Sequence, residues 1–477
     1  MEDRGYQRDI QEAVRAAMLA GEKSILVQLC TGGGKTHLAS DMIHTALGKG
    51  KRSHFAVHRK ILLKQTAETF NAHEIPYGYI AADFDFNPYS KTHICSIDTL
   101  HSRLGQFDVP DLLWVDECHM ANSPTWSLVI DYYRRHGAWI IGLSATPIRT
   151  DGTGLKKHFG HMVCGPNMRW LIDNGFLSDY RMFSPSSLNL KGIATRMGDL
   201  AKDQLAAFME GNSAVIGDAV RHYKLHADNT LNITYCVSRK HSEMTAEKFR
   251  NEGVVAVHID GLTPQTERKR IIDAYARREI KVLTNVELIT TGFDLAAQVG
   301  MDVNVESISL LRPTKSLSLY LQMVGRGLRR KPQPAIILDH ANCRSSFGLP
   351  DDDYDWTLED REVQKRGSGS TVMVKHCNNC YFDHRPAPVC QNCGTVYEIQ
   401  YRQVEEREGE LKEIDRAVKK LQTEMGADSI EMRYRQGTFD SKEMDYLVRL
   451  GRKKGYKNPE KWAAFIITSR MAKKDKK

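Results

Sequence analysis

The 477-residue chain has no apolar run near the roughly 20 residues that a bilayer-spanning helix needs. Its first residues, MEDRGYQRD, are charged and lack the apolar core of a signal peptide. Hydrophobic residues make up 41% and charged residues 26%, which is typical of a folded chain and not of a disordered one. We therefore exclude a membrane-bound or secreted protein and expect a cytoplasmic one with no membrane partner.

Charge of either sign is nearly balanced except at one end. Lys and Arg number 67 against 59 Asp and Glu, and the segment 451–477 alone has ten basic and two acidic residues, which accounts for the whole excess. A basic end on a neutral body predicts contact with a polyanion, because Lys and Arg release counterions from phosphates. A frayed, solubilising tail is the alternative interpretation.

Cysteines are few and uneven, with six single ones and a cluster of four. Cys377 and Cys380 form one CxxC pair, and Cys390 and Cys393 form a second. Without an export signal, disulfides are not expected, and two such pairs predict a tetrahedral Zn²⁺ site in a zinc ribbon. A redox dithiol is the less favoured alternative. The segment is too short to bury a core, so the metal should contribute most of its folding energy.

Short apolar runs alternate with helix-period segments in two successive series. This pattern predicts two parallel sheets covered by helices on both faces, joined near residues 165–184. The expected strands are 24–30, 53–58, 92–97, 112–117 and 138–145, then 231–238, 254–260, 280–286, 303–311 and 335–339. The expected helices are 35–47, 60–73, 240–251, 264–276 and 316–328, and a solvated helix is expected at 403–423.

A glycine-rich turn follows the first expected strand. It consists of Thr31, Gly32, Gly33 and Gly34, and leads into Lys35 and Thr36 at the start of a helix. Glycines let backbone N–H groups close around phosphates, and a helix N-terminus adds favourable partial charge. We expect Lys35 to reach the β- and γ-phosphates of a nucleoside triphosphate and Thr36 to bind Mg²⁺. Leu29 replaces the usual first glycine of the pattern.

Two adjacent carboxylates end the expected strand 112–117. Asp116 is expected to hold Mg²⁺, and Glu117 to orient or deprotonate the attacking water. A buried carboxylate is costly without a partner, and a helix N-cap would explain one acid but not both. The pair therefore favours triphosphate hydrolysis.

The DECH residues at 116–119 resemble the DEAD/DEAH box, and further motifs of superfamily 2 helicases occur in order. They are RGYQ at 4–7 (Q motif), HRK at 58–60 (motif Ia), SAT at 144–146 (motif III), TTGFD at 290–294 (motif V) and QMVGRGLR at 322–329 (motif VI). The resemblance covers about residues 1–345. Within the superfamily the chain resembles the RadD-type DNA repair helicases of bacteria and phages, through motifs V and VI, the ILDHA strand and the cysteines after it.

This resemblance implies two tandem RecA-like domains with ATP between them. Arg4, Gln7, Gly292 and Asp294 would contact ATP; Gln322, Arg326 and Arg329 would be catalytic; Ser144, Ala145 and Thr146 would couple the domains. Because Arg326 and Arg329 are three residues apart, we expect them on one helix face as arginine fingers. The backbone of the nucleic acid would be held by Arg59, Ser96, Thr99, Ser238, Gly261, Thr263 and Thr290.

The expected organisation is an α/β protein of two RecA-like domains, a zinc ribbon and a helical, basic C-terminal segment. The boundaries are 1–165, 166–345, 346–370 for a linker, 371–398 for the ribbon and 399–477 for the last region. We expect an ATP-, Mg²⁺- and Zn²⁺-dependent DNA helicase or translocase, with single-stranded or branched DNA as partner and a single-strand-binding or repair protein as a further candidate. The resemblance implies a nucleoid-associated protein of a bacterial or phage-infected cell. An ATP-gated clamp or an RNA helicase remains open.

Overall fold

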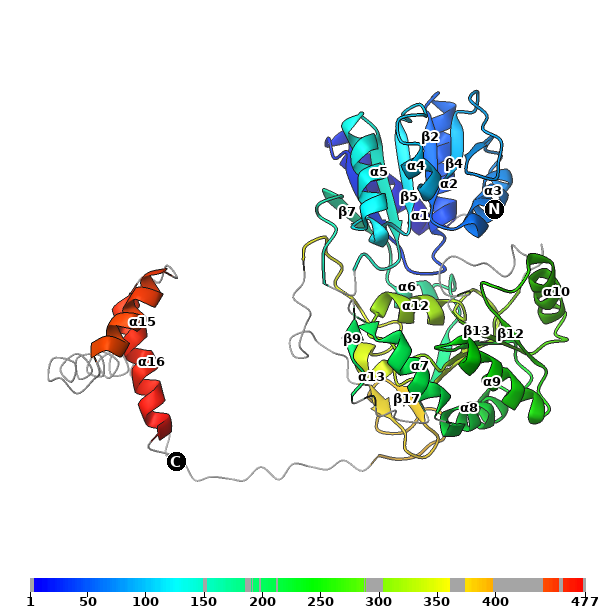
Figure 1. The fold of residues 1–477 in the computed structure, drawn as a ribbon. Coiled ribbons are helices and arrows are strands. Elements are labelled where there is room, and N and C mark those ends of the chain that lie inside the picture. The colour runs from blue at the N-terminus through cyan, green and yellow to red at the C-terminus, as the bar shows by residue number, and fades with distance from the viewer. Residues whose placement is uncertain are drawn as a thin grey trace. The chain divides into compact units, whose positions relative to one another are not determined.

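The computed structural model describes residues 4–148, 152–184, 190, 192–196, 199–211, 213–286, 288, 303–360, 374–397, 441–453 and 458–474. The chain divides into two compact units, Met1–Glu398 and Ile399–Lys477. The first unit contains two α/β lobes (Figure 1). No helix in the described ranges is both long and apolar enough to cross a membrane.

Lobe 1 is a parallel sheet of seven strands in the order β3-β4-β2-β5-β6-β1-β7. The strands are β1 (Ser24–Gln28), β2 (Ser53–Val57), β3 (Gly78–Ile80), β4 (Thr92–Ser96), β5 (Leu112–Asp116), β6 (Trp139–Ser144) and β7 (His161–Cys164). The helices are α1 (Gly5–Leu19), α2 (Lys35–Gly48), α3 (Lys60–Ala72), α4 (Ile97–Ser102) and α5 (Pro124–Arg135). All five predicted strands are confirmed. The two edge strands β3 and β7 went unpredicted because they are short and β7 is largely exposed.

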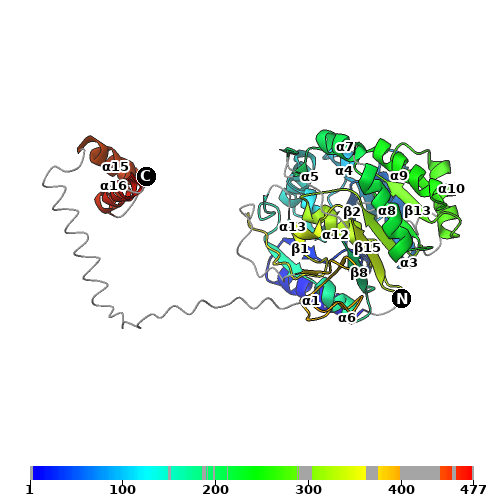
Figure 2. The same ribbon diagram turned by 90° about the horizontal axis from the view of Figure 1, so that it is seen from below.

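Lobe 2 is an eight-stranded sheet in the order β12-β13-β11-β14-β15-β8-β17-β16. Its parallel strands are β8 (Tyr180–Phe183), β11 (Asn232–Tyr235), β12 (Ala256–Ile259), β13 (Val282–Asn285), β14 (Ser307–Leu310) and β15 (Ala335–Asp339). Its helices are α7 (Lys202–Glu210), α8 (Ser213–His226), α9 (Arg239–Asn251), α10 (Gln265–Ala276), α12 (Leu317–Gly325) and α13 (Arg344–Phe347), and α6 (Met168–Asp173) stands between the lobes. Figure 2 shows α8 and α9 side by side along this sheet. A short hairpin pairs β9 (Thr195–Arg196) with β10 (Asp199–Leu200).

The four-cysteine segment continues the sheet of lobe 2. Its strands β16 (Lys375–His376) and β17 (Phe382–His384) pair with each other, and β17 pairs antiparallel with β8. Cys377, Cys390 and Phe382 are buried in one hydrophobic cluster with side chains from α8, α9 and the sheet. The segment is therefore an edge of lobe 2, and only its strand pairing reveals this.

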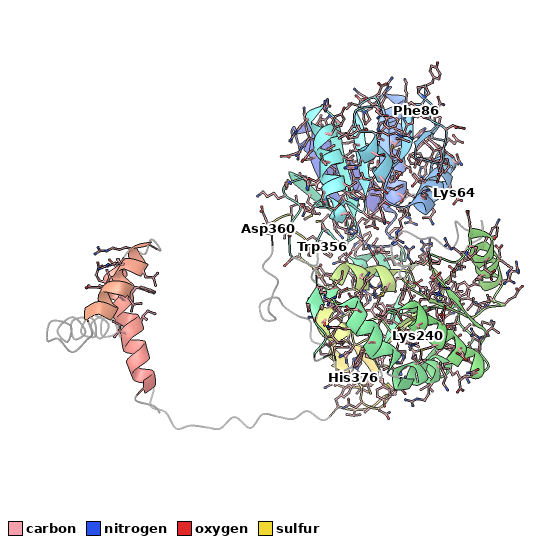
Figure 3. All side chains as sticks on the ribbon, in the orientation of Figure 1. Lys64, Phe86, Lys240, Trp356, Asp360 and His376 are labelled. Carbon is pink, nitrogen blue, oxygen red and sulfur yellow. The ribbon has the colours of Figure 1, made fainter. Side chains whose placement is uncertain are left out.

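Residues 349–360, here called the strap, lie within the segment that the sequence predicts as a linker. At one end, the amides of Leu155 and Lys156 donate to Leu358 O at 2.8 and 2.9 Å. At the other, Asp351 lies 3.3 Å from Arg169 Nη1 and 3.2 Å from Arg385 Nη2. This part of the predicted linker is therefore packed, because its aromatic residues join the main core and its buried acid has cationic partners. Figure 3 labels Trp356 and Asp360 near the junction of the lobes.

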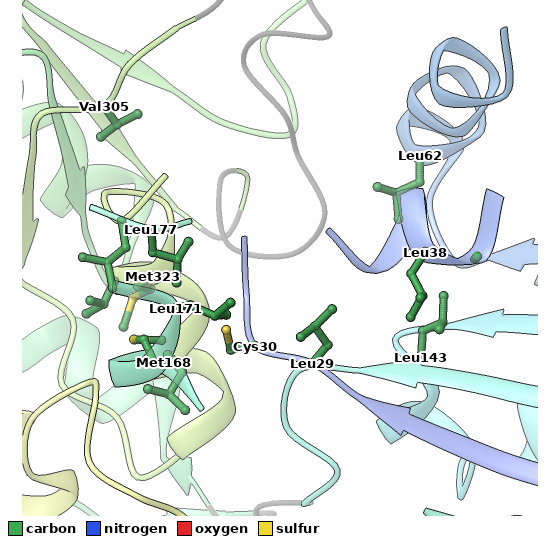
Figure 4. Close-up of a cluster of buried hydrophobic side chains, with 14 of the residues drawn as sticks. Leu29, Cys30, Leu38, Leu62, Leu143, Met168, Leu171, Leu177, Val305 and Met323 are labelled. Atoms are coloured by element: carbon green, nitrogen blue, oxygen red, sulfur yellow. The ribbon is translucent and has the colours of Figure 1, made fainter. Parts of the chain in front are cut away.

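One hydrophobic cluster runs through both lobes. Leu29 and Cys30, at the end of β1, lie between lobe-1 side chains such as Leu38 and the side chains of Leu171 and Met323 (Figure 4). Burial of apolar surface contributes roughly 25 cal/mol per Å². The loop that leaves β1 is therefore anchored to both lobes.

The second unit contains a helix pair, α15 (Ser441–Lys453) and α16 (Pro459–Lys474). Leu447, Ala463 and Ile467 form its small buried cluster. Both helices fall in the region predicted to be helical and basic. The solvated helix predicted at 403–423 lies outside the described residues.

Candidate functional site

The predicted phosphate loop joins β1 to α2, and α2 begins at Lys35 as expected. Gly32 and Gly34 have φ values of +84° and +83°, a left-handed conformation that side chains rarely adopt. The loop closes on itself through Gly33 N, which donates to Cys30 O at 3.0 Å. Lys35 Nζ reaches back to Leu29 O at 3.2 Å, so the ammonium lies across the loop.

The RGYQ segment packs directly on this loop. Tyr6 donates its hydroxyl to Gly33 O at 2.8 Å, and Gln7 Nε2 lies 3.3 Å from Gly33 O and 3.2 Å from Gly34 O. A Cβ on Gly34 would stand 3.1 Å from Arg4 Nη1 and still closer to Gln7. The structure thus brings Arg4 and Gln7 to the phosphate loop. The role of Tyr6 was not predicted, although it lies inside the recognised motif.

Asp116 is the last residue of β5 and Glu117 follows it, at the same sheet edge as the phosphate loop. Burial and the Glu117 carboxylate raise the pKa of Asp116, and Lys35 opposes this shift. Burial also acts to raise the pKa of Glu117, but the hydrogen bond and charge of His119 outweigh it and hold that pKa low. Glu117 therefore keeps its charge, as a proton acceptor must. Glu117 also has a φ of +51°, a strained backbone conformation for a residue other than glycine.

The SAT residues link these acids to lobe 2. His119 Nδ1 lies 3.3 Å from Glu117 Oε2 and 3.5 Å from Ser144 Oγ. Thr146 N donates to Ser144 Oγ at 3.1 Å, and Thr146 Oγ1 donates to Ser318 Oγ on α12 at 2.6 Å. Ala145 O, between them, accepts from Gln28 Nε2 at 3.0 Å. A continuous polar chain therefore runs from the acid pair to α12. His119 and Ser318 were not predicted; only the DECH spelling pointed to the first.

Motif VI corrects one prediction. Gln322 is on α12, with a buried Nε2 that has no hydrogen-bond partner among the described residues. The helix ends at Gly325, before either arginine, so Arg326 and Arg329 do not share a helix face. Two glycines weaken the helix, and the chain turns to pair Arg329 with Leu177 in an isolated antiparallel bridge. Burial raises the pKa of Tyr235 at the end of β11, and the charges of both guanidinium groups oppose this shift.

The phosphate loop and the motif VI turn, here called the two half-sites, contact each other at glycine positions. A Cβ on Gly325 would stand 2.7 Å from Thr31 Cβ, and a Cβ on Gly32 would stand 2.9 Å from Leu177 Cδ2. Contacts this short show that both positions tolerate no side chain without movement. The motif VI turn therefore lies directly against the phosphate loop, with Arg326 as the next residue after the contact.

Three of the seven predicted nucleic-acid contacts fall at helix starts. Arg59, Ser96 and Ser238 are the residues that precede α3, α4 and α9, while Thr99 is buried within α4. Ser238 accepts from His241 N at 3.0 Å and donates to Glu210 Oε1 at 2.5 Å. The Ser238 hydroxyl therefore joins the start of α9 to the end of α7.

Gly261 and Thr263 belong to one hydrogen-bonded turn after β12. Asp260 Oδ1 accepts from Thr263 N at 2.9 Å and from Thr263 Oγ1 at 3.1 Å, and Arg268 Nη2 donates to Gly261 O at 3.3 Å. Thr290, Gly292 and Asp294 of motif V lie outside the described residues.

The four cysteine sulfurs converge. All four Sγ atoms lie within 4.8 Å of one another, with Cys377 3.6 Å from Cys393 and Cys380 3.7 Å from Cys390. A disulfide would need about 2.05 Å, whereas a tetrahedron with Zn–S bonds of about 2.3 Å has edges of about 3.8 Å. The geometry therefore fits one zinc ion. Thr395 lowers the pKa of Cys393 to about 5, as thiolate ligation favours.

A nucleotide loop on one α/β lobe against an arginine turn on another is the arrangement of a two-lobed nucleoside triphosphatase. Residues 1–149 match the family model of the type III restriction enzyme res subunit, and residues 216–331 match that of the helicase conserved C-terminal domain. A 51.5 kDa protein of Lactococcus phage (isolate 7-9) is 30% identical over 400 residues, or 83% of each chain.

Two further comparisons, one with a sequence relative and one with a solved structure, point to the same class of protein. IRC3 of Saccharomyces cerevisiae, described as an ATP-dependent helicase, is 28% identical over 350 residues, which are 68% of this chain and 49% of that protein. A fragment described as an HsdR subunit of a type I restriction enzyme from Vibrio vulnificus shares the fold, with a TM-score of 0.55 and 21% identity over 73% of this chain and 66% of that one. The chain belongs to the superfamily 2 helicases, and its enzymatic class is that of the ATP-dependent helicases.

Proposed function

We propose that this protein hydrolyses ATP to move along DNA and to separate its strands. Lys35 and the loop Thr31, Gly32, Gly33 and Gly34 would hold the phosphates, and Thr36 and Asp116 would bind Mg²⁺. Glu117 would take the proton from a water that attacks the γ-phosphorus while the bond to ADP breaks. Mg²⁺, when bound, would neutralise charge on the phosphate oxygens.

The observation that carries this proposal is the contact between Gly325 and Thr31. It puts the turn with Arg326 and Arg329 beside the loop where a triphosphate would lie. Guanidinium groups stabilise charge that develops on the transferring phosphoryl oxygens, and such a finger is worth about 10³–10⁵ in rate. The buried, unpartnered Nε2 of Gln322, on the same helix, suits a further contact to a phosphate oxygen.

The chain of contacts between Glu117 and Ser318 supports a motor mechanism. ATP would favour a closed arrangement of the lobes, and loss of the γ-phosphate would release it. Through His119, Ser144 and Thr146, a change at the acid pair would be felt at α12 on the other lobe. Arg59, Ser96, Thr99, Ser238, Gly261, Thr263 and Thr290 would grip the nucleic-acid backbone during this cycle.

DNA is the proposed substrate, and repair, recombination or replication the proposed setting. The RadD likeness and the restriction-enzyme description of the N-terminal family model support DNA. The basic residues of the last 27 positions would add a backbone contact. The four cysteines would hold a structural Zn²⁺.

ATPase rates with single-stranded DNA, duplex, forked DNA and RNA test the proposal, followed by strand separation on a tailed duplex. We expect the greatest stimulation by single-stranded or branched DNA, together with strand separation. Stimulated hydrolysis without strand separation would favour the ATP-gated clamp, whose residues would be the same. Stimulation by RNA alone would overturn DNA as the substrate.

A further inference from the structure

The turn that carries the two arginines is held by a residue from between the lobes. Ser178 N donates to Leu328 O at 3.0 Å, and Ser178 Oγ donates to Arg329 O at 2.9 Å. In return, Lys331 N donates to Ser178 Oγ at 2.8 Å. Ser178 is 5% exposed, so water does not replace these bonds easily. One serine thus holds the backbone on both sides of Arg329.

A lysine ammonium closes the same turn from within. Lys331 Nζ donates to Gly327 O and lies 3.5 Å from Arg329 O. Burial lowers the pKa of Lys331 to about 8, and Glu306 opposes the shift. A buried cation is costly unless it binds acceptors, and here the acceptors are the carbonyls of the arginine turn.

The neighbour of Ser178 contacts the opposite half-site. Leu177 is 3% exposed, pairs with Arg329 in the isolated bridge and presents Cδ2 to Gly32 of the phosphate loop. Ser178 is followed closely by β8, the strand that also pairs with the four-cysteine segment. Residues 177 and 178 therefore contact both loops, Leu177 through Gly32 and Arg329 and Ser178 through the backbone of the arginine turn.

We propose that Leu177 and Ser178 are positioning residues that set the distance between the arginine turn and the phosphate loop. This inference rests on the proposed function, in which Arg326 acts on the γ-phosphate. Movement of the Leu328–Arg329 backbone would carry the guanidinium groups with it. A displacement of about 1 Å at a reacting centre can cost about 100-fold in rate.

The test compares Ser178→Ala with Ser178→Thr, which keeps the hydroxyl, in DNA-stimulated ATP hydrolysis by the full chain. Ser345→Ala is the matched control, because Ser345 is exposed and its Oγ donates only to the nearby Asn342 O at 2.8 Å. For Ser178→Ala we expect kcat to fall on the order of 10-fold with KM for ATP within about twofold. Ser178→Thr should recover most of the rate, and Ser345→Ala should match the parent.

A double variant separates positioning from general destabilisation. Ser178→Ala combined with Arg326→Ala should turn over no more slowly than Arg326→Ala alone, because a misplaced arginine and a missing one are the same loss. Full additivity, or an equal fall for Ser178→Thr and Ser178→Ala, would overturn the positioning role.

Two outcomes distinguish this inference from the proposed function. Parent-like turnover by Arg326→Ala would overturn the arginine finger itself. An inactive Arg326→Ala beside a parent-like Ser178→Ala would overturn only the inference. If Ser178→Ala fails to fold, Lys331→Met takes its place, since it keeps the apolar stem and removes the ammonium contact. A parent-like kcat for folded Lys331→Met would then count against the positioning role.

Discussion

The phosphate loop and the arginine turn are two halves of one candidate site, yet they are held in different ways. The phosphate loop closes on bonds between near neighbours, such as Gly33 N to Cys30 O, and stands between a strand and a helix that continue it. Its most distant hydrogen-bond partner named above is Tyr6, 27 residues before Gly33. The arginine turn has a local bond from Lys331 Nζ to Gly327 O, but its backbone is also held by Ser178, about 150 residues earlier in the chain. The geometry of a locally closed loop can be predicted from its own sequence. A turn held by a distant residue can be recognised as a motif, but its geometry cannot be predicted in this way.

Removing the key cation from each half should separate the two most clearly. We expect Arg326→Ala to lower kcat by about 10³–10⁵-fold while ATP binding persists, because the finger acts mainly on the transition state. Lys35→Ala should lower both kcat and ATP affinity, since the loop binds the ground state as well. Steady-state kinetics with a nucleotide-binding titration measure both. If Arg326→Ala weakened ATP binding and Lys35→Ala did not, the arginine turn and not the phosphate loop would be the half that binds ATP in the ground state.

Glu117→Gln tests the acid pair beside the phosphate loop. The amide keeps the shape but cannot accept the proton, so kcat should fall by about 10²–10⁴-fold. The zinc content of the variant, measured by elemental analysis, should remain that of the parent. Parent-like hydrolysis would show that another group is the base.

Loss of the metal ligands should perturb the structure of the arginine turn more than that of the phosphate loop. Cys377→Ser with Cys380→Ser should remove bound zinc and loosen β17. This strand pairs with Met182 and Phe183 of β8, the strand that begins two residues after Ser178. We expect a melting temperature lower by about 5 °C or more, given about 2–4 °C per kcal/mol for a domain of this size. Basal ATPase should fall but remain measurable, and ATP affinity should hold. Calorimetry and zinc analysis check this; an unchanged melting temperature would contradict it.

The smallest expected effect is at the strap. Arg385→Ala takes one cation from Asp351, whose side chain is 2% exposed, and leaves Arg169 and Tyr180 as its partners. We expect about 1–3 kcal/mol less free energy of unfolding in urea, because a buried carboxylate loses a charged partner. Arg196→Ala is the control, since its ion pair with Asp203 is 63% and 62% exposed and worth at most about 1 kcal/mol. Equal losses of unfolding free energy in both variants would show that the ion pair between Arg385 and Asp351 does not anchor the strap.

Sequence patterns that span only a few residues determined much of the fold and of the candidate sites of this protein. Strands such as SILVQ and LLWVD are apolar, short and bounded by polar residues, so the α/β class and the paired sheets were predictable. Residue spacing alone also predicts the geometry of the glycine loop before Lys35 and of the two CxxC pairs. The superfamily and its ATP-dependent chemistry followed from motifs in order, and the comparisons confirm them.

Tertiary structure alone decided which distant segments share an edge or a turn. Spacing predicted a helix over 316–328 and both arginines on one helix face. The helix ends at Gly325 instead, because the bridge between Arg329 and Leu177 outweighs weak helix propensity around two glycines. Composition predicted a linker where the strap packs, and a separate ribbon where β17 joins β8. Long-range hydrogen bonds leave no period in the sequence, because either partner alone looks like any polar residue.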